Sequence, residues 1–137
     1  MKIIINKCFG GFGLSEEAMY RYAELKGLTL YPEKGKPSLF TTYWTVPEDA
    51  RPKEIDWAKS SQKERAAYNE SYRNSVLYDR DISRTDPDLI KTVEELGSAA
   101  DGRCAELAIV EIPDDVEYTI EEYDGSEHIA ETHRTWY

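Results

Sequence analysis

The stretch Lys2–Gly27, KIIINKCFGGFGLSEEAMYRYAELKG, decides how the chain is expected to fold. Lys2–Lys7 is apolar, rich in β-branched residues and followed by glycines, which is typical of a short strand. Ser15 then suits a helix N-cap, and the two acidic residues after it favour the positive end of the helix dipole. Apolar residues recur at helical spacing as far as Gly27, which ends the pattern. The sequence therefore predicts a strand, a glycine turn and a helix in direct succession.

The glycine turn raises the question of a phosphate-binding loop. Gly10-Gly11-Phe12-Gly13 lacks the third glycine of a dinucleotide-binding fingerprint, and no P-loop Lys-Ser or Lys-Thr pair follows it. Both standard nucleotide folds are therefore excluded. Two interpretations stay open. The stretch is either a plain strand-to-helix turn, or a ligand contact in which N–H groups such as that of Gly11 hold an anion and Phe9 and Phe12 stack on a base.

The remaining chain predicts further strands and a second clear helix. Strands are expected at Leu28–Tyr31, Ser38–Val46, Ser75–Asp81, Cys104–Pro113 and Val116–Gly125, and a strand or short helix at 126–137. Asp86 is the expected N-cap of the second helix, with Pro87 at its first position and Gly97 at its end. Residues 48–74 are polar, with a surface helix in SSQKERAAYNESYRN, and indicate an insertion or arm. The sum is a single α+β domain, 1–137, with a mostly antiparallel sheet and two principal helices.

The formal net charge of −10 is unevenly distributed. Residues 114–131 contain eight acidic side chains and no Lys or Arg. Binding to a nucleic acid polymer is not expected, because neutralising phosphates requires the opposite charge. The acidic stretch is either a solvated face or an imitation of DNA. No run of about 18 apolar residues or signal-peptide core is present, so we expect no membrane association and a cytoplasmic location.

Catalytic and metal-binding patterns are absent from the sequence. Cys8 and Cys104 are far apart in the sequence, and neither a CxxC nor an HExxH spacing occurs, so we expect reduced thiols, no metal and no cofactor. No pair of acidic residues stands out as an acid/base couple. His128 and His133 do not belong to a recognisable nucleophile arrangement, so we do not expect an enzyme.

Two further places carry candidate binding residues. Arg84 precedes the predicted cap Asp86, and Tyr78 lies shortly upstream. An arginine beside a helix N-terminus suits a phosphate, and an aspartate suits a ribose hydroxyl, although a simple cap also explains Asp86.

Arg103 and the C-terminal HRTWY complete the candidates. Arg103 follows a turn and precedes an apolar strand, so it lies either at a pocket rim or on the open surface. Arg134 and Trp136 combine a cation with an aromatic ring, which suggests that the end of the chain docks onto the body or onto a partner chain.

Three parts of the sequence resemble a family of small phage and prophage proteins. They are INKCFGGFGLS, then RTDPDLIKTVEELG with ADGRCAEL, and finally VEIPDDVEYTIEEYDGSEHIAETHRTW, whereas Leu28–Asn74 shows no likeness. The chain is most similar in these parts to the phage Thoeris anti-defence sponge family. Members of that family hold a cyclic ADP-ribose isomer, made by a host TIR enzyme, without cleaving it. They form dimers that assemble into larger rings, and some hold cyclic oligonucleotides.

The resemblance implies a counter-defence protein, in the cytoplasm of an infected bacterium, that sequesters a cyclic nucleotide as a homodimer or larger homo-oligomer. The pocket roles would fall on Tyr78, Arg84, Asp86 and Arg103, with Arg134 at a second site. Asp86 departs from the asparagine expected there, and because a carboxylate repels a phosphate, it would serve a ribose or the helix cap.

A competing hypothesis is an acidic protein–protein inhibitor or DNA mimic. Its residues 114–131 would block a basic surface of a host defence protein or DNA-binding protein. The two hypotheses differ in what they require of the structure. A sponge requires its arginines to converge on a cavity with aromatic walls, and an inhibitor requires its carboxylates on one continuous surface.

Overall fold

A computed structural model describes residues 1–34 and 41–132 of the chain. The chain forms two compact units, of which the first combines Met1–Lys26 with the chain from Asp79 onward and the second is Gly27–Tyr78. The described residues contain three α-helices and six strands, and every strand pairs antiparallel, which confirms the α+β prediction. The prediction of a single domain with an arm at 48–74 stays a prediction, and those residues lie within the second unit.

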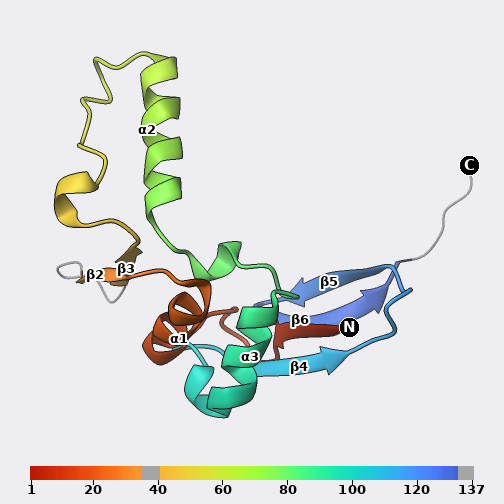
Figure 1. Cartoon of the computed structure of the whole chain (residues 1–137). Coiled ribbons are helices and arrows are strands. Elements are labelled where there is room, and N and C mark those ends of the chain that lie inside the picture. The colour runs from red at the N-terminus through yellow and green to blue at the C-terminus, as the bar shows by residue number, and fades with distance from the viewer. Residues whose placement is uncertain (35–40, 133–137) are drawn as a thin grey trace, which may run out of the picture. The chain divides into compact units, whose positions relative to one another are not determined.

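The first unit is built around β1 (Lys2–Asn6), which pairs with β4 (Leu107–Glu111) so that Ile4 lies opposite Ile109 (Figure 1). Ile3, Ile4 and Ile5 form the centre of the core, with at most 2% of each residue exposed. The apolar run that predicted this strand is therefore buried on both faces.

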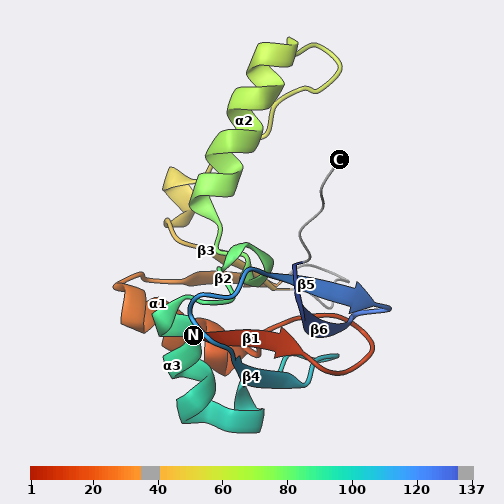
Figure 2. The ribbon, with the colours of Figure 1, turned by 90° about the vertical axis from the view of Figure 1, so that its right-hand side faces the viewer.

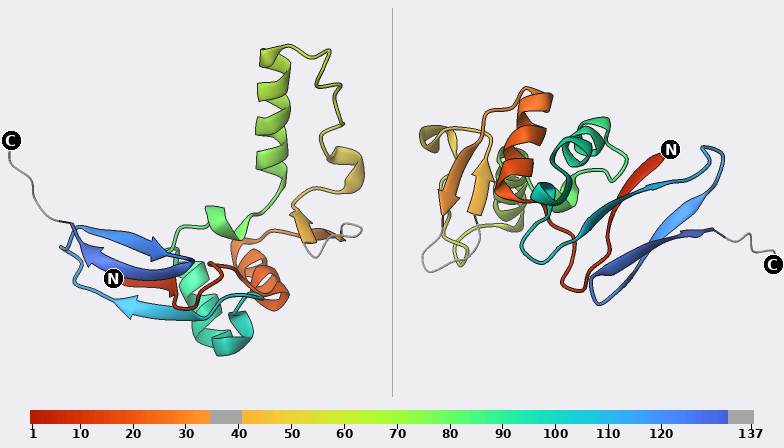
Figure 3. Two further views of the ribbon diagram at one scale, coloured as in Figure 1. Left: turned by 180° about the vertical axis from the view of Figure 1, so that it is seen from behind. Right: turned by 90° about the horizontal axis from the view of Figure 1, so that it is seen from below.

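A hairpin completes the strands of the first unit. It joins β5 (Tyr118–Tyr123) to β6 (Ser126–Glu131) through Asp124 and Gly125, whose φ angles of +50° and +88° suit a two-residue hairpin turn. The hairpin runs beside β1, as the view from below shows (Figure 3). The described strands form three separate two-stranded ladders rather than one sheet. On the second edge of β1, the Glu127 side chain and the side chain and carbonyl of Arg84 make the hydrogen bonds that a third strand would make.

Helices α1 (Glu16–Lys26) and α3 (Pro87–Leu96) pack against each other, and α3 also contacts β1 (Figure 1). Both predicted N-caps are confirmed. Ser15 Oγ accepts the Ala18 N–H at 3.1 Å, and an Asp86 carboxylate oxygen accepts the Asp88 N–H at 2.8 Å. The short 3-10 helix η3 (Gly97–Ala100) follows α3, and another, η2 (Asp79–Asp81), precedes it.

The second unit contains β2 (Tyr31–Lys34) paired with β3 (Thr41–Trp44), the 3-10 helix η1 (Glu48–Ala50) and α2 (Gln62–Ser75). The chain that leads into α2 runs back beside it (Figure 2). Few aliphatic residues are buried here, and the helix is held mainly by a row of edge-to-face and tilted aromatic contacts. In order, the row is Trp57, Tyr68, Tyr72 and Trp44.

Two strand predictions in this region were wrong. Residues 28–30 are not strand, because the pairing with β3 begins only at Tyr31. Ser75–Asp81 is not a strand either, because α2 continues to Ser75, Val76 makes only an isolated bridge to Trp44, and η2 follows. The strand expected at Ser38–Val46 is confirmed for Thr41–Trp44, which is β3, whereas residues 45 and 46 are not strand and residues 38–40 lie outside the described residues.

Candidate functional site

The glycine stretch is a junction of three backbone segments. A Cβ added to Gly125 would lie 2.3 Å from the amide nitrogen of Gly11, and one added to Gly10 would lie 2.8 Å from the Cβ of Cys104. A Cβ on Gly102 would lie 2.6 Å from the carbonyl carbon of Gly13. Since only glycine permits such close approach, the packing by itself accounts for this glycine-rich stretch and supports the interpretation as a turn.

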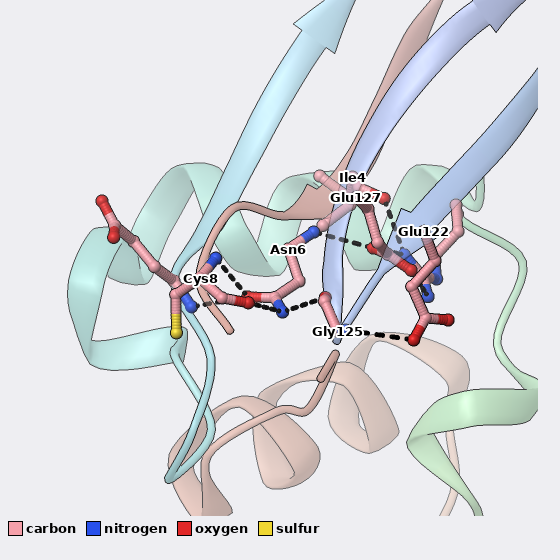
Figure 4. Close-up of polar contacts among 8 residues, drawn as sticks. Ile4, Asn6, Cys8, Glu122, Gly125 and Glu127 are labelled. Carbon is pink, nitrogen blue, oxygen red and sulfur yellow. Dashed lines mark hydrogen bonds and ion pairs between the residues drawn. The ribbon is translucent and has the colours of Figure 1, made fainter. Parts of the chain in front are cut away.

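Asn6 connects the segments of this junction (Figure 4). Its Nδ2 donates to the carbonyl oxygens of Cys8 and Gly125 at 2.8 and 2.7 Å, and its Oδ1 accepts the Glu106 N–H at 2.8 Å. Asn6 is fully buried, and these bonds satisfy a side chain that would otherwise be costly to bury. The site prediction from sequence missed this residue, although an amide directly between an apolar strand and glycines is a visible signal.

Arg84 forms an ion pair with Glu127 that is largely shielded from solvent. Two guanidinium nitrogens contact the two carboxylate oxygens at 2.7 and 3.0 Å, and only 20% of the Arg84 side chain and 8% of the Glu127 side chain are exposed. The guanidinium also lies over the ring of Phe12, 3.6 Å from its centroid. The Arg84 guanidinium thus binds a carboxylate of the same chain, whereas the sequence suggested a phosphate of a ligand. The Phe12 ring, for which stacking on a base was considered, is buried and has the Arg84 guanidinium over its face.

The same pair closes the second edge of β1. The Ile4 N–H donates to the Arg84 carbonyl at 2.9 Å, and the Asn6 N–H donates to a Glu127 carboxylate oxygen at 2.8 Å. Burial raises the pKa of Glu127, but the hydrogen bonds from Arg84 and Asn6 outweigh it and hold this pKa below its usual value. Glu127 therefore stays ionised at neutral pH, and its pair with Arg84 takes the place of a neighbouring strand.

Asp86 is also engaged within the fold. Besides capping α3, it accepts the Tyr22 hydroxyl at 2.8 Å and lies 3.1 Å from Lys26 Nζ. Burial opposes ionisation of Asp86, but these contacts lower its pKa on balance. Burial, followed by the hydrogen bond to Asp86, raises the pKa of Tyr22 to about 12. The capping role is confirmed, and the ribose role stays a prediction.

The other predicted site residues are dispersed. Phe9 is 65% exposed, and Arg103 is also exposed. Each directly precedes one of the two junction residues whose backbones approach each other closely, Gly10 and Cys104. The Arg103 guanidinium forms no hydrogen bond or ion pair with any described residue. Tyr78, 39% exposed, belongs to the second unit. Arg134 and Trp136 lie outside the described residues.

Phe9 and Arg103 thus border, through their chain neighbours, the backbone junction that contains Gly11, whereas Phe12 lies against Arg84. Cys8 lies at the same junction, with its Sγ 3.0 Å from the Cys104 carbonyl oxygen, and both thiols are free. The two cysteines are therefore neighbours in space although they are distant in the sequence.

Negative charge is concentrated in the first unit. Its sequence contains 20 Asp and Glu against 9 Lys and Arg, whereas the second unit contains 7 against 8. Four of its described cations are already paired with carboxylates: Lys2, Arg21, Lys26 and Arg84. The acidic residues of 114–131 are mostly exposed, for example Asp114 with 89% and Glu121 with 57% of the side chain accessible. The surplus charge therefore faces solvent.

An open groove of about 610 Å³ lies in the first unit between the C-terminal half of α3, η3 and β4. Its apolar lining is Val93, Leu107 and Ile109, and its ionisable lining consists of carboxylates only, Glu94, Asp101 and Glu106. None of the site residues predicted from the sequence lines it. Its chemistry suits an apolar or cationic ligand and disfavours an anionic one.

Neither a metal site nor a membrane helix is found in the described chain. Within residues 1–34 and 41–132, no three His, Cys, Asp or Glu side chains are grouped so that they could hold a metal ion. None of the helices in these ranges combines the length and apolar character needed to cross a membrane. Comparison with protein-family models, curated proteins and solved structures gave no match.

Proposed function

We propose that this protein binds another protein that has a basic surface. The exposed carboxylates of the first unit described above would cover that basic surface. The observation that carries this proposal is the separation of charge between the two units, with the acidic surplus confined to the first and largely exposed there. Residues 114–131 supply its densest part, on and beside the β5–β6 hairpin. No catalytic step is part of this proposal.

Such a surface recognises its partner by electrostatic complementarity. Exposed charges of one sign attract a partner of the opposite sign, raise its association rate and discriminate against acidic proteins. Together with the likeness to phage proteins, this favours a host defence protein or DNA-binding protein as the target. A protein that normally binds DNA presents the basic surface that such an inhibitor needs.

The test compares two triple variants with equal changes in charge. Immobilised protein is expected to capture basic host proteins from a cell extract, and duplex DNA and added salt are expected to release them. Glu117→Gln, Glu121→Gln and Glu131→Gln together remove three exposed charges from the hairpin and should reduce capture. Glu54→Gln, Glu64→Gln and Glu70→Gln in the second unit remove the same charge and should leave capture unchanged. Capture that resists both salt and the hairpin variant would refute the proposal.

A second candidate function, capture of a cyclic nucleotide, is favoured by one specific observation. An exposed ring, Phe9, and an arginine without a described partner, Arg103, flank the backbone contact at the glycine junction. A ring offers stacking to a base, and a guanidinium offers a fork of donors to a phosphate. In this candidate the ligand would be a cyclic ADP-ribose isomer or a cyclic oligonucleotide, held intact by a homodimer or larger homo-oligomer.

Thermal shift measurements with these nucleotides test the second candidate. Stabilisation that disappears in Arg103→Ala and persists in Arg73→Ala, an exposed arginine of the second unit, would support it. Ligand recovered intact after heat denaturation would support storage, whereas a cleaved product would show an enzyme. If none of the nucleotides raises the melting temperature, the second candidate is rejected.

A further inference from the structure

Strand β4 has one edge that no described strand covers (Figure 1). The hydrogen bonds from Ile112 N–H to the Met1 carbonyl, 2.9 Å, and from Lys7 N–H to the Glu106 carbonyl, 2.8 Å, show which residues face β1. In an antiparallel pair, every second residue bonds to the partner strand and the residues between them direct their N–H and C=O groups the other way. Leu107, Ile109 and Glu111 therefore present their backbone groups to the outer edge.

The outer edge is only partly satisfied within the fold. The Leu107 N–H donates to an Asp101 carboxylate oxygen at 2.9 Å. The N–H and C=O groups of Ile109 and Glu111 have no hydrogen-bond partner among the described residues. An unpaired strand edge of this kind is a template for the addition of another strand.

The groove lies beside the same strand. Leu107 and Ile109 of β4 line it together with Val93 of α3, and the three carboxylates described above surround this apolar patch. Its volume of about 610 Å³ is within the usual range for ligand pockets. Glu94 is already paired with Lys2 at 2.9 Å, and Asp101 accepts the Leu107 N–H, so Glu106 is the lining carboxylate whose side chain has no described partner. A ligand of this groove therefore needs apolar side chains for the patch and a cation for Glu106.

We propose that the outer edge of β4 and this groove form the docking site for an extended segment of a partner protein, in which Lys or Arg alternates with branched apolar residues. The backbone of the segment pairs with Ile109 and Glu111. Its apolar side chains contact Leu107 and Val93, and its cations, which alternate with them and point to the other face, reach Glu106. Strand addition of this type obtains affinity from main-chain hydrogen bonds and specificity from the side chains. The inference rests on the proposed function, because it names where on the acidic unit the basic partner is held.

The probe is a synthetic peptide of sequence KVKIKVK, with EVEIEVE as its charge-reversed control. Fluorescence anisotropy is expected to show binding of the first peptide and none of the second. Hydrogen exchange of the complex is expected to show new protection of the Ile109 and Glu111 amides. Glu106→Lys should weaken binding at least tenfold, whereas Glu54→Lys, the same reversal at an exposed position of the second unit, should leave binding nearly unchanged.

A second variant tests the backbone contact itself. Glu111→Pro removes an N–H that makes no hydrogen bond to any described residue and should abolish binding. Because a proline in a strand carries a risk of misfolding, circular dichroism first compares Glu111→Pro with the parent protein. If the two spectra differ, Glu106→Lys decides whether the docking site is correct.

The outcomes separate the inference from the proposed function. If KVKIKVK binds but the β4 amides gain no protection and Glu106→Lys has no effect, the docking site is wrong and the acidic surface retains its role. If KVKIKVK does not bind at all, the docking site is wrong, and the capture experiment described above decides the proposed function on its own. If the two amides become protected as the protein concentration rises without peptide, the edge pairs with a second copy of the chain and the inference is overturned.

Discussion

Arg84 and Glu127 show how one pair of side chains replaces a strand. Their charges are nearly removed from solvent, and the pair also bonds to the backbone of Ile4 and Asn6. Removing one partner of such a pair leaves the other charge buried without compensation, which costs more than the pair itself contributes. The pair is therefore a sensitive point of the first unit.

Glu127→Gln is expected to lower the free energy of unfolding by about 3 kcal/mol at neutral pH. Urea denaturation followed by circular dichroism measures this change. The matched control is Glu121→Gln on the same hairpin, because Glu121 pairs with His128 in an exposed position and should contribute less than about 1 kcal/mol. Equal effects of the two variants would show that burial of the Arg84–Glu127 pair has no energetic consequence.

The same residue predicts a pH dependence. The pKa of Glu127 in the folded state lies below its usual value of 4.5, so its ionised form is stabilised by folding. This contribution is complete above about pH 4.5 and is lost as the pH falls through the lowered folded-state pKa. The stability difference between the parent and Glu127→Gln should therefore shrink between pH 6 and pH 3. A difference that stays constant over this range would contradict the assignment.

Gly125 is expected to tolerate no side chain. Its φ of +88° disfavours other residues, and an added Cβ would lie 2.3 Å from the backbone of Gly11. Gly97 has a φ of +56° but open space around it, so Gly97→Ala isolates the backbone strain, about 1 kcal/mol. Gly125→Ala should lower the melting temperature much more than Gly97→Ala does. Equal decreases in the two variants would show that the backbone around Gly125 can move to make room for a methyl group at little cost.

At the scale of elements, α1 and α3 could be predicted because their signals are local. Ser15 and Asp86 begin them, and Gly27 and Gly97 follow their last residues, as expected. Strand partners could not be predicted, because alternation identifies a strand but not the strand that it pairs with. The pairing of β1 with β4 joins residues about a hundred positions apart.

The candidate site shows the same division between local and distant signals. The capping role of Asp86 was visible in the sequence because it depends on the next residues only. Arg84 was interpreted as a cation available to a phosphate, and its partner Glu127 is 43 residues away, beyond any local pattern. The groove beside β4 was missed for the same reason, since it joins α3 and η3 to a strand.

Helix α2 depends on aromatic contacts rather than on an aliphatic core. Tyr72 lies edge-to-face on Trp44 with ring centroids 5.0 Å apart, and Trp44 is 6% exposed. Tyr72→Ala is expected to cost about 3 kcal/mol and to expose the α2 amides to hydrogen exchange. Asn69→Ala, at an exposed position of the same helix, should leave exchange unchanged. If the α2 amides exchange hydrogen equally fast in the two variants, the interpretation that the aromatic row stabilises α2 is wrong.

At the scale of the whole molecule, the charge separation has a cost. Exposed carboxylates of the first unit repel one another, and this repulsion destabilises the compact state. Raising the salt concentration to about 0.5 M screens the repulsion, so the melting temperature should rise. The triple hairpin variant, with Glu117, Glu121 and Glu131 changed to Gln, should start higher and gain less from salt. A melting temperature that is independent of salt would show that the acidic residues do not interact.

The discontinuous first unit determines the order in which the chain can fold during synthesis. β1 leaves the ribosome before its partner β4 and the carboxylate of Glu127, which are made about a hundred residues later. The second unit is one continuous segment that is complete before either of them. Contacts between residues so distant in the chain form slowly. The three isoleucines of β1 therefore lack the partner strand β4 while the residues between the two strands are translated, and we expect the chain to be most prone to aggregate in this interval.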